Sequence, residues 1–225
     1  GLVTIATPPE AFAVYAAEEP GTLIKPVEDV AAFRDLLDDP RKNAVLVGPG
    51  AGLTKATAEK VLAALAAGKA VVIDADGLSI FADASETLIE AITGPCLLTP
   101  HEGEFKRLFS VDGDKPTRAR AAAKLTGAVV LLKGADTVIA EKKGRAVINA
   151  SGTPDLATAG SGDVLAGMAL GLMTQGMDPF DAGCAAAWLH GALAEDIGPG
   201  LIAEDLPAKL PGILRQLRST ADTKP

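Results

Sequence analysis

The sequence predicts an α/β domain of three layers, with a mostly parallel sheet between two layers of helices. Short β-branched runs alternate with Ala- and Leu-rich stretches along the whole chain. Several of these runs are apolar at every position, among them Val45–Val47, Val71–Ile73 and Val129–Leu132. Strands that are hydrophobic on both faces belong in a parallel sheet covered by helices on each side. The alternation of the two kinds of segment is typical of such a domain.

The short β-branched runs give the expected strands. These are Leu2–Ala6, Thr22–Ile24, Ala44–Val47, Ala70–Asp74, Cys96–Thr99, Ala128–Leu132, Thr137–Ala140 and Ala146–Ile148. The last two are separated by the polar turn Glu141–Gly144. We expect this pair to form a short β-hairpin attached to the sheet.

The Ala- and Leu-rich stretches give the expected helices. These are Pro9–Ala17, Val27–Leu37, Lys55–Ala67, a turn or two within Gly77–Ile92, His101–Phe109, Pro116–Thr126, Gly162–Met173, Pro179–Asp196 and Pro207–Arg218. Only the end of the chain has the composition of a linker, so residues 1–218 are predicted to form one domain and residues 219–225 a tail. Because the first residues already read as a strand, we expect a further segment upstream.

Composition limits the classes of function. The chain has 225 residues, of which 48% are hydrophobic, and a net charge of −8. This charge argues against a nucleic-acid partner, since phosphate backbones require clustered Lys and Arg. No apolar run approaches the ~20 residues that span a bilayer, and no signal peptide is visible, so we expect a cytoplasmic protein without a membrane partner. Cys96 and Cys184 are expected to be buried free thiols.

The most informative motif is Gly160-Ser161-Gly162-Asp163, which precedes an Ala- and Leu-rich helical stretch. A glycine turn that opens a helix can bind an anion, because unpaired amides and the positive end of the helix dipole both favour phosphate. An acid in the first turn lies beside that phosphate and can serve as a base. The alternative is that Ser161 or Asp163 simply caps the helix. From the motif alone, helix capping and phosphate binding are about equally favoured.

Other polar motifs follow the expected strands. The loop Gly48–Gly52 can bring backbone close to a ligand, although an ordinary strand–helix turn is the default interpretation, and it has neither a Walker nor a GxGxxG pattern. Asp74 and Asp76 follow the next strand. They could hold a divalent cation or ligand hydroxyls, but capping of the next turn is slightly favoured.

Two further strand ends carry candidate ligands. His101 and Glu104 stand one helical turn apart, so they could face one cleft, or could be plain helix N-terminal groups. Lys133 ends a buried strand, where its ammonium needs an anion, and phosphate is a natural candidate. His190, in an Ala-rich helix, is expected to be a packed or interface residue.

The position of these motifs is the main argument for a ligand site. Ligands of parallel α/β sheets bind at the carboxyl ends of the strands. Each motif has an ordinary structural explanation by itself, but five of them after successive strands are improbable without a shared ligand. The sequence therefore favours an enzyme that handles phosphate.

At these motifs the chain resembles the ADP/ATP-dependent NAD(P)H-hydrate dehydratases, the carbohydrate-kinase-like domain of the YjeF family, which has a ribokinase-like fold. The matching segments are Val47–Gly52, Ile73–Leu78, Leu98–Phe105, Leu132–Ile139, Asn149–Pro154 and Ala157–Gly167. They occur in family order and cover almost the whole chain. Their combination is far more specific than any single motif.

The resemblance implies repair of NADH or NADPH whose reduced ring has been hydrated (NADHX or NADPHX). A phosphoryl group passes from ADP, or from ATP, to the ring hydroxyl, and loss of phosphate restores the nicotinamide. The implied site residues are as follows: Asp163 as base; Gly52, His101 and Asp163 at the substrate; Lys133, Gly134, Ala135, Asp136, Thr137 and Gly162 at the adenine nucleotide; and Gly160, Ser161 and Gly162 as an anion hole. Mg²⁺ bridges the phosphates and reaches Glu104 through water, and relatives suggest a homo-tetramer, for which the helix around Trp188 could supply an interface.

The chain departs from the family pattern at several positions. The family usually has Gly-Met where this chain has Asp155-Leu156, commonly Thr at Ser161, and Leu at Ala51. Ser161 should be harmless because the backbone binds the anion, whereas Asp155 adds a charge near the expected phosphate site. The family also has a glycine-rich substrate segment before residue 1. We expect the chain to bind its substrate less well without it.

Two other functions are compatible with the motifs. One is a ribokinase-like kinase for a vitamin-precursor alcohol, but such kinases tend to have Asn at the position of His101 and often Cys at that of Asp163. The other is a non-catalytic nucleotide-binding module, which would not need the Asp163 carboxylate. The sequence leans only weakly to ADP over ATP, and it does not distinguish NADHX from NADPHX.

Overall fold

The computed structural model describes residues 1–18 and 21–222. The strands span Thr4–Thr7 (β1), Leu23–Pro26 (β2), Ala44–Val47 (β3), Ala70–Ile73 (β4), Cys96–Leu98 (β5), Val129–Leu132 (β6), Val138–Ala140 (β7) and Ala146–Ile148 (β8). The α-helices span Phe12–Glu18 (α1), Val30–Leu37 (α2), Lys55–Ala66 (α3), Asp76–Ser79 (α4), Ser85–Ala91 (α5), Glu102–Leu108 (α6), Lys115–Thr126 (α7), Ser161–Met173 (α8), Pro179–Ile197 (α9) and Asp205–Asp222 (α10). Short 3₁₀ helices lie at Pro9–Ala11 (η1) and Pro154–Leu156 (η2).

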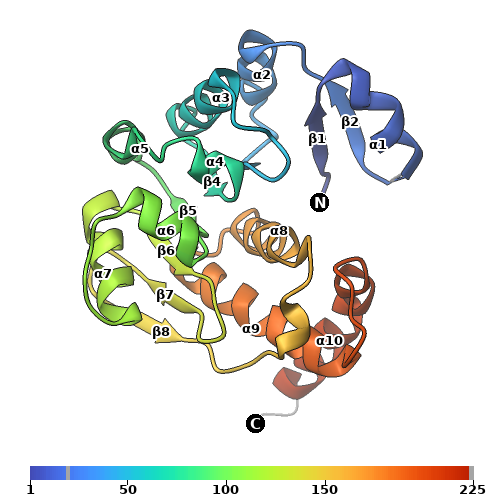
Figure 1. The fold of residues 1–225 in the computed structure, drawn as a ribbon. Helices are drawn as coiled ribbons and strands as arrows, with labels where there is room; N and C mark the ends of the chain where they lie inside the picture. Colours follow the sequence, from blue (N-terminus) through green and yellow to red (C-terminus); the bar gives the residue numbers. More distant parts are fainter. Residues whose placement is uncertain (19–20, 223–225) are drawn as a thin grey trace.

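A six-stranded sheet forms the centre of the molecule, in the order β3-β4-β5-β6-β7-β8 (Figure 1). The strands from β3 to β6 are parallel, and β7 and β8 are antiparallel to their neighbours. The predicted mostly parallel sheet and the predicted hairpin are therefore both confirmed.

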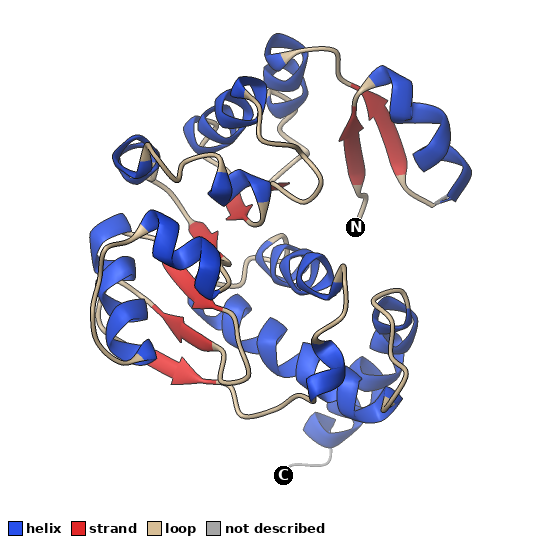
Figure 2. Ribbon diagram, in the orientation of Figure 1, coloured by secondary structure: helices blue, strands red, loops and turns tan. Residues whose placement is uncertain are grey.

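Helices cover the sheet on both faces, which explains why its central strands are apolar throughout (Figure 2). In β6, Val130 and Leu132 face the layer built from α2 to α7, and Leu131 faces α8 and α9. All three side chains are fully buried. Helix α10 packs on the outer side of α9. The three-layer α/β architecture is confirmed.

The first two strands do not enter this sheet. β1 and β2 pair with each other in parallel and form a separate two-stranded sheet, joined by η1 and α1. Unlike the central strands, both keep half-buried or exposed positions, and Leu23 is 50% exposed. The sequence pattern predicted the two strands but not their separation.

Several element boundaries differ from the prediction. Helix α8 begins at Ser161, one residue early, because Gly160 adopts a left-handed conformation just before it. Helix α10 continues past Arg218 to Asp222, since neither glycine nor proline interrupts residues 213–222. Part of the predicted tail is thus helical, and residues 223–225 lie outside the described part.

The two thiols differ in burial. Cys96 is buried as predicted, whereas Cys184 is only half-buried, and neither forms a disulfide within the described residues. Burial raises the pKa of the Cys96 thiol to about 12. In the described part of the chain, no helix has both the length and the hydrophobicity needed to cross a bilayer.

Candidate active site

The loops after β3, β4, β5 and β6 lie at one edge of the sheet, because these strands are parallel. Hydrogen bonds connect neighbouring loops. The Gly52 N–H donates to Asp76 Oδ2 at 2.8 Å, and the Lys133 N–H donates to the Pro100 carbonyl at 2.8 Å. The motifs of the sequence therefore meet at the edge where this fold class binds ligands.

A close backbone approach shapes the turn after β4. Gly48 has φ +134°, and a Cβ atom there would lie 1.7 Å from the Asp74 carbonyl oxygen, so only glycine fits. The turn itself is closed by the Gly77 N–H, which donates to the same carbonyl at 3.0 Å. Ala75 lies inside it with φ 48° and ψ −120°, and is the one non-glycine residue with positive φ in the described chain. This strained turn separates Asp74 from Asp76.

The Lys133 ammonium pairs with a buried carboxylate. Its Nζ lies 2.7 Å from Asp74 Oδ1, and the Asp74 side chain is 1% exposed. Asp76 instead accepts the Gly52 N–H. No side chain caps α4, so the slight preference for Asp74 or Asp76 as a helix cap was wrong. The pair explains how a lysine can end a buried strand.

Helix α8 begins without a side-chain cap. Its N-cap is Gly160, with φ +80°, and neither Ser161 nor Asp163 accepts a capping hydrogen bond. Helices α2, α3, α7 and α9 are all capped by a side chain, namely Asp29, Thr54, Asp114 and Asp178. The capping interpretation of the Gly160–Asp163 motif is therefore wrong.

The start of α8 carries concentrated positive potential. The Ser161 N–H donates to the Thr158 carbonyl at 3.4 Å, but the Gly162 and Asp163 amides belong to the first turn and have no acceptor within the helix. The Lys133 ammonium lies next to them, since a Cβ atom on Gly162 would be 3.3 Å from its Nζ. Amides, helix dipole and ammonium together favour an anion here.

Asp163 stands in the first turn of α8 with its side chain exposed. Partial desolvation raises the pKa of its carboxyl group, and the charges of Asp74 and Asp76 act in the same direction, while Lys133 opposes them. A carboxylate with a raised pKa accepts a proton more readily. It therefore suits the role of a general base.

His101 and Glu104 form a capping box at the start of α6. His101 Nδ1 accepts the N–H groups of Gly103 and Glu104, and Glu104 Oε2 accepts the N–H of His101 at 2.9 Å. The helix-terminal interpretation of this pair is thus confirmed. Because Nδ1 accepts, the ring proton is on Nε2, and the half-exposed His101 ring (53%) can still donate to a ligand. Glu104 is buried, with its Oε1 3.4 Å from His101 Nε2.

The loop that follows β6 holds the residues predicted to bind the adenine nucleotide. Gly134, Ala135 and Asp136 are exposed. The Thr137 hydroxyl donates to the Gly134 carbonyl at 2.9 Å, which closes the loop. Lys115, a largely buried lysine at the start of α7, binds Asp136 Oδ1 at 2.7 Å. The loop is therefore held both by its own Thr137–Gly134 hydrogen bond and by the ion pair with Lys115 of α7.

His190 contacts Ser161, the first residue of α8. Its Nε2 lies 3.0 Å from the Ser161 hydroxyl, and both residues are buried. Burial lowers the pKa of His190 to about 4, and the charge of Lys133 acts in the same direction. The imidazole is therefore neutral at pH 7. The packed interpretation of His190 is confirmed, and its contact with Ser161 was not predicted.

The Asp155 carboxylate binds the side chain of Thr153, two residues earlier in the chain. Its Oδ2 accepts the Thr153 hydroxyl at 2.9 Å, and its N–H donates back to Thr153 Oγ1. These bonds belong to η2. The charge that this chain adds near the expected phosphate site is thus held in a local turn.

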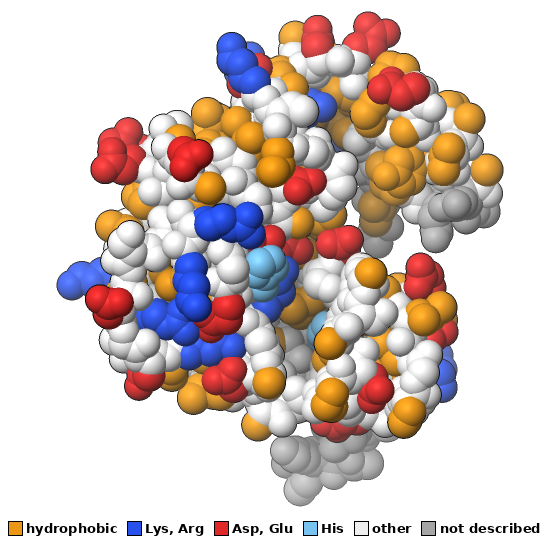
Figure 3. Space-filling model, in the orientation of Figure 1, with side chains coloured by type: hydrophobic (Ala, Val, Ile, Leu, Met, Phe, Trp, Pro, Cys, Tyr) orange, Lys and Arg blue, Asp and Glu red, His pale blue; other side chains and the backbone are white. Residues whose placement is uncertain are grey.

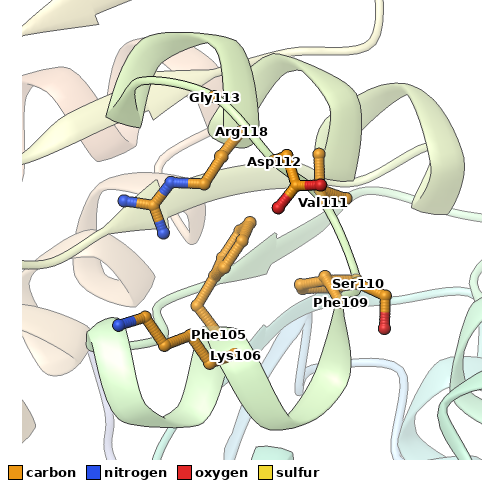
Figure 4. A pocket seen from close by; sticks show the side chains of 8 residues that line it. All are labelled: Phe105, Lys106, Phe109, Ser110, Val111, Asp112, Gly113 and Arg118. Atoms are coloured by element: carbon orange, nitrogen blue, oxygen red, sulfur yellow. The ribbon is translucent and has the colours of Figure 1, made fainter.

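A cavity of 520 Å³ lies apart from the predicted residues, between α6 and the loop before α7 (Figure 4). It is lined by Phe105, Lys106, Phe109, Ser110, Val111, Asp112, Gly113 and Arg118. The Arg118 guanidinium is already engaged, because it donates to both oxygens of Glu102 at 2.9 Å. Figure 3 shows Lys, Arg, Asp, Glu and His side chains gathered near the middle of this face of the molecule.

Comparison with known proteins identifies the family. The family model described as NAD(P)H-hydrate dehydratase matches residues 1–213. The chain belongs to this family. It is 36% identical, over 220 residues, to the ADP-dependent (S)-NAD(P)H-hydrate dehydratase of Neisseria meningitidis serogroup B, covering 92% of this chain and 71% of that protein.

A second relative is larger. The bifunctional NAD(P)H-hydrate repair enzyme of Salinibacter ruber is 42% identical over 180 residues, which are 76% of this chain and 33% of that enzyme. Similar enzymes from Gloeobacter violaceus and Moorella thermoacetica are covered to 39% and 46%. This chain thus spans less than half the length of these bifunctional relatives.

Solved structures agree with the family. The ADP/ATP-dependent NAD(P)H-hydrate dehydratase of Bacillus subtilis, co-crystallised with ATP and Mg²⁺ and soaked with CoA, is 29% identical. Its TM-score is 0.83, with 96% of this chain and 81% of that chain covered. A ribokinase-like superfamily protein of Enterococcus faecalis, 23% identical with a TM-score of 0.82 and coverage of 96% and 77%, shares the fold. The ribokinase-like architecture is confirmed.

Sequence reasoning missed two supporting contacts, Lys115 with Asp136 and His190 with Ser161. Lys115 gave no signal because a lysine in a polar loop is usually solvated, and only the fold brings it to Asp136. His190 is 29 residues from Ser161 in sequence, and nothing in its own helix indicates that contact. A polar residue within the Ala-rich run 185–194 was the available hint.

Proposed function

We propose that this protein is an ADP-dependent NAD(P)H-hydrate dehydratase, which restores hydrated NADH or NADPH. One observation supports this most directly. The uncapped start of α8, the Lys133 ammonium and the exposed Asp163 carboxylate come together at the carboxyl edge of the sheet. An anion site beside a base is what phosphorylation of a hydroxyl group requires.

The proposed chemistry has two steps. The ring hydroxyl oxygen attacks the terminal phosphorus of ADP while its proton passes to Asp163, and the bond from that phosphorus to the AMP oxygen breaks. The ring C–O bond then breaks with release of inorganic phosphate, and loss of a proton from the adjacent carbon restores the double bond. Hydroxide is a poor leaving group and phosphate a good one, so the first step makes the second possible.

The protein lowers the first barrier by charge stabilisation. The Gly162 amide and its neighbours in the first turn, together with the Lys133 ammonium, stabilise charge on the transferring phosphoryl group. Gly160 and Ser161 set the path of that turn. Gly52 and His101 are proposed to contact the hydrated dinucleotide, with the Nε2–H of His101 as a donor.

The adenine nucleotide is proposed to bind along Lys133, Gly134, Ala135, Asp136 and Thr137. Among the described residues, no group of three or more His, Cys, Asp or Glu side chains is arranged to hold a metal. We therefore propose that Mg²⁺ arrives bound to the nucleotide phosphates, whose charge it would offset. Glu104 is still proposed to reach it through water, although its Oε2 already accepts the His101 N–H and its Oε1 lies 3.4 Å from His101 Nε2.

We also propose the phosphoryl donor, the substrates, the cellular location and the oligomeric state. ADP is favoured as donor, with ATP as the alternative, and both hydrated dinucleotides are proposed as substrates. We also propose a cytoplasmic homo-tetramer. Trp188, 43% exposed on α9, is the proposed interface residue.

The decisive assay follows the absorbance of reduced nicotinamide after the protein is mixed with hydrated NADH, Mg²⁺ and either ADP or ATP. Recovery with a nucleotide, and none without it, is the expected result. Phosphorylation of a vitamin-precursor alcohol without nicotinamide recovery would indicate the kinase, and nucleotide binding without any turnover would indicate a binding module.

A further inference from the structure

Asp74 has an unusual environment for a carboxylate. Its side chain is 1% exposed and its Oδ1 binds the Lys133 ammonium at 2.7 Å. Its Oδ2 is buried and has no hydrogen-bond partner among the described residues. A buried, half-satisfied carboxylate is unfavourable for stability, because the unpaired oxygen has lost its hydration. Such a group calls for an explanation beyond the fold.

The location of Lys133 suggests that explanation. Its ammonium lies next to the first turn of α8, as the distance of 3.3 Å from a Cβ atom on Gly162 shows. A lysine side chain has a long flexible stem, and it would otherwise turn towards solvent. Asp74 comes from the end of β4 and Lys133 from the end of β6, so the ion pair crosses β5 and holds the ammonium inside the site.

We propose that Asp74 is a positioning residue for phosphoryl transfer, which holds the Lys133 ammonium at the start of α8 before the phosphates arrive. The inference rests on the proposed function. An ammonium has three N–H donors, so Lys133 can bind a phosphoryl oxygen while it keeps its bond to Asp74. The pair therefore places a cation at the reacting group without a rearrangement during the reaction.

Asp74 also acts on the base. The charged groups that face Asp163 are Asp74 after β4, Asp76 in α4 and Lys133 after β6. His190 on α9 is neutral at pH 7, and the loop after β3 has no titratable side chain. The charge of Asp74 raises the pKa of Asp163, whereas Lys133 lowers it. The effect of Asp74 is the larger of the two, so replacing Asp74 by a neutral residue lowers the pKa of Asp163 even when the Lys133 ammonium moves away.

The test is a double-mutant cycle with Asp74→Asn, Lys133→Met and the double variant. Asp74→Asn is expected to lower kcat on the order of 10- to 100-fold, since a misplaced group has effects of that size, with a smaller change in the KM for ADP. At a pH above the acid limb, where Asp163 is ionised in every variant, Asp74→Asn should have little further effect on kcat in the Lys133→Met background, because Asp74 positions the ammonium of Lys133. If the fold-losses of kcat in Asp74→Asn and Lys133→Met multiplied in the double variant, the two residues would act independently and the proposal would be overturned.

A second readout does not depend on turnover. The carboxyl carbon of Asp163, followed by NMR during a pH titration, should titrate at lower pH in Asp74→Asn than in the parent protein, and the acid limb of kcat/KM should move the same way. An unmoved titration would also overturn the proposal. If the parent protein does not restore hydrated NADH at all, the proposed function fails, and this titration still tests the role of Asp74.

Controls separate positioning from stability. Loss of one partner of a buried pair is destabilising, so Asp74→Asn is expected to lower the free energy of unfolding. The double variant removes both charges and is expected to regain stability. Glu141→Gln is the matched control, because this buried carboxylate pairs with Arg145 at the opposite end of the sheet. It should lower stability and leave kcat and the acid limb unchanged. A fall of kcat in Glu141→Gln equal to that in Asp74→Asn would reduce Asp74 to a structural role.

Discussion

At the scale of single residues, Asp163 separates binding from chemistry. Its carboxylate is proposed to take a proton, whereas the amides around it are proposed to bind the phosphate. Asp163→Asn keeps the shape of the side chain and the helix, so we expect ADP affinity within a few-fold of the parent and no measurable turnover. Calorimetric titration with ADP and the nicotinamide assay measure the two effects. An active Asn variant would exclude Asp163 as the base.

His190 makes the fold sensitive to acid. Burial lowers its pKa to about 4 from an ordinary value of 6.5, so between these values the unfolded chain binds more protons than the folded one. Above pH 6.5, His190 is neutral in both the folded and the unfolded chain, and the stability that its neutral form permits is fully present. This contribution to the free energy of unfolding falls by about 1.4 kcal/mol per pH unit as the pH drops towards 4. Urea unfolding across this range measures the slope.

The matched variant for this effect is His190→Gln. Its amide does not titrate and can still reach the Ser161 hydroxyl, so the acid-dependent loss should be smaller by the His190 contribution. An identical pH dependence in parent and variant would show that His190 does not control acid stability.

At the scale of elements, the start of α8 allows stability and activity to be separated. A Cβ atom on Gly162 would lie 3.3 Å from Lys133 Nζ, and the flexible lysine can yield. Gly162→Ala should therefore leave the fold intact, displace the ammonium and lower kcat on the order of tenfold. Gly167→Ala, in the same helix with open space around the new Cβ, should raise stability by about 1 kcal/mol and leave kcat unchanged.

The turn between β4 and α4 stores backbone strain. Ala75 has φ 48° and ψ −120°, a conformation that glycine adopts far more easily. Ala75→Gly is therefore expected to raise the free energy of unfolding by about 1 kcal/mol, measured by urea denaturation. A loss of stability on this change would mean that the Ala75 methyl group contributes more by packing than it costs in strain.

The elements also show what could be predicted from sequence. The apolar runs of β4 and β6 predicted buried parallel strands because composition alone reports burial on both faces. The start of α8 was ambiguous, since Ser and Asp are common caps, and only the structure shows that Gly160 leaves the turn uncapped. Contacts between distant segments, such as Asp74 with Lys133 and Ser161 with His190, depend on the assembled sheet and have no local pattern.

At the scale of the whole molecule, the hydrophobic pattern of the sequence did not predict that β1 and β2 form a sheet separate from the six-stranded one. The two strands have strand-like composition, but composition does not specify the partner of a strand. Apolar side chains are exposed in α1 and just before β1, among them Val14 at 58%, Leu2 at 88% and Val3 at 62%. Two-stranded sheets are marginally stable by themselves, because each strand has only one neighbour.

The whole molecule should therefore open in two stages. Amide hydrogen exchange followed by mass spectrometry is expected to be fast in β1 and β2, and slow in β4, β5 and β6, whose strands have neighbours on both sides and helices on both faces. The edge strand β8 serves as an internal control, because it belongs to the large sheet but has one neighbour. If β1 and β2 were as protected as β5, they would unfold together with the central sheet, and the two sheets would form one cooperative unit.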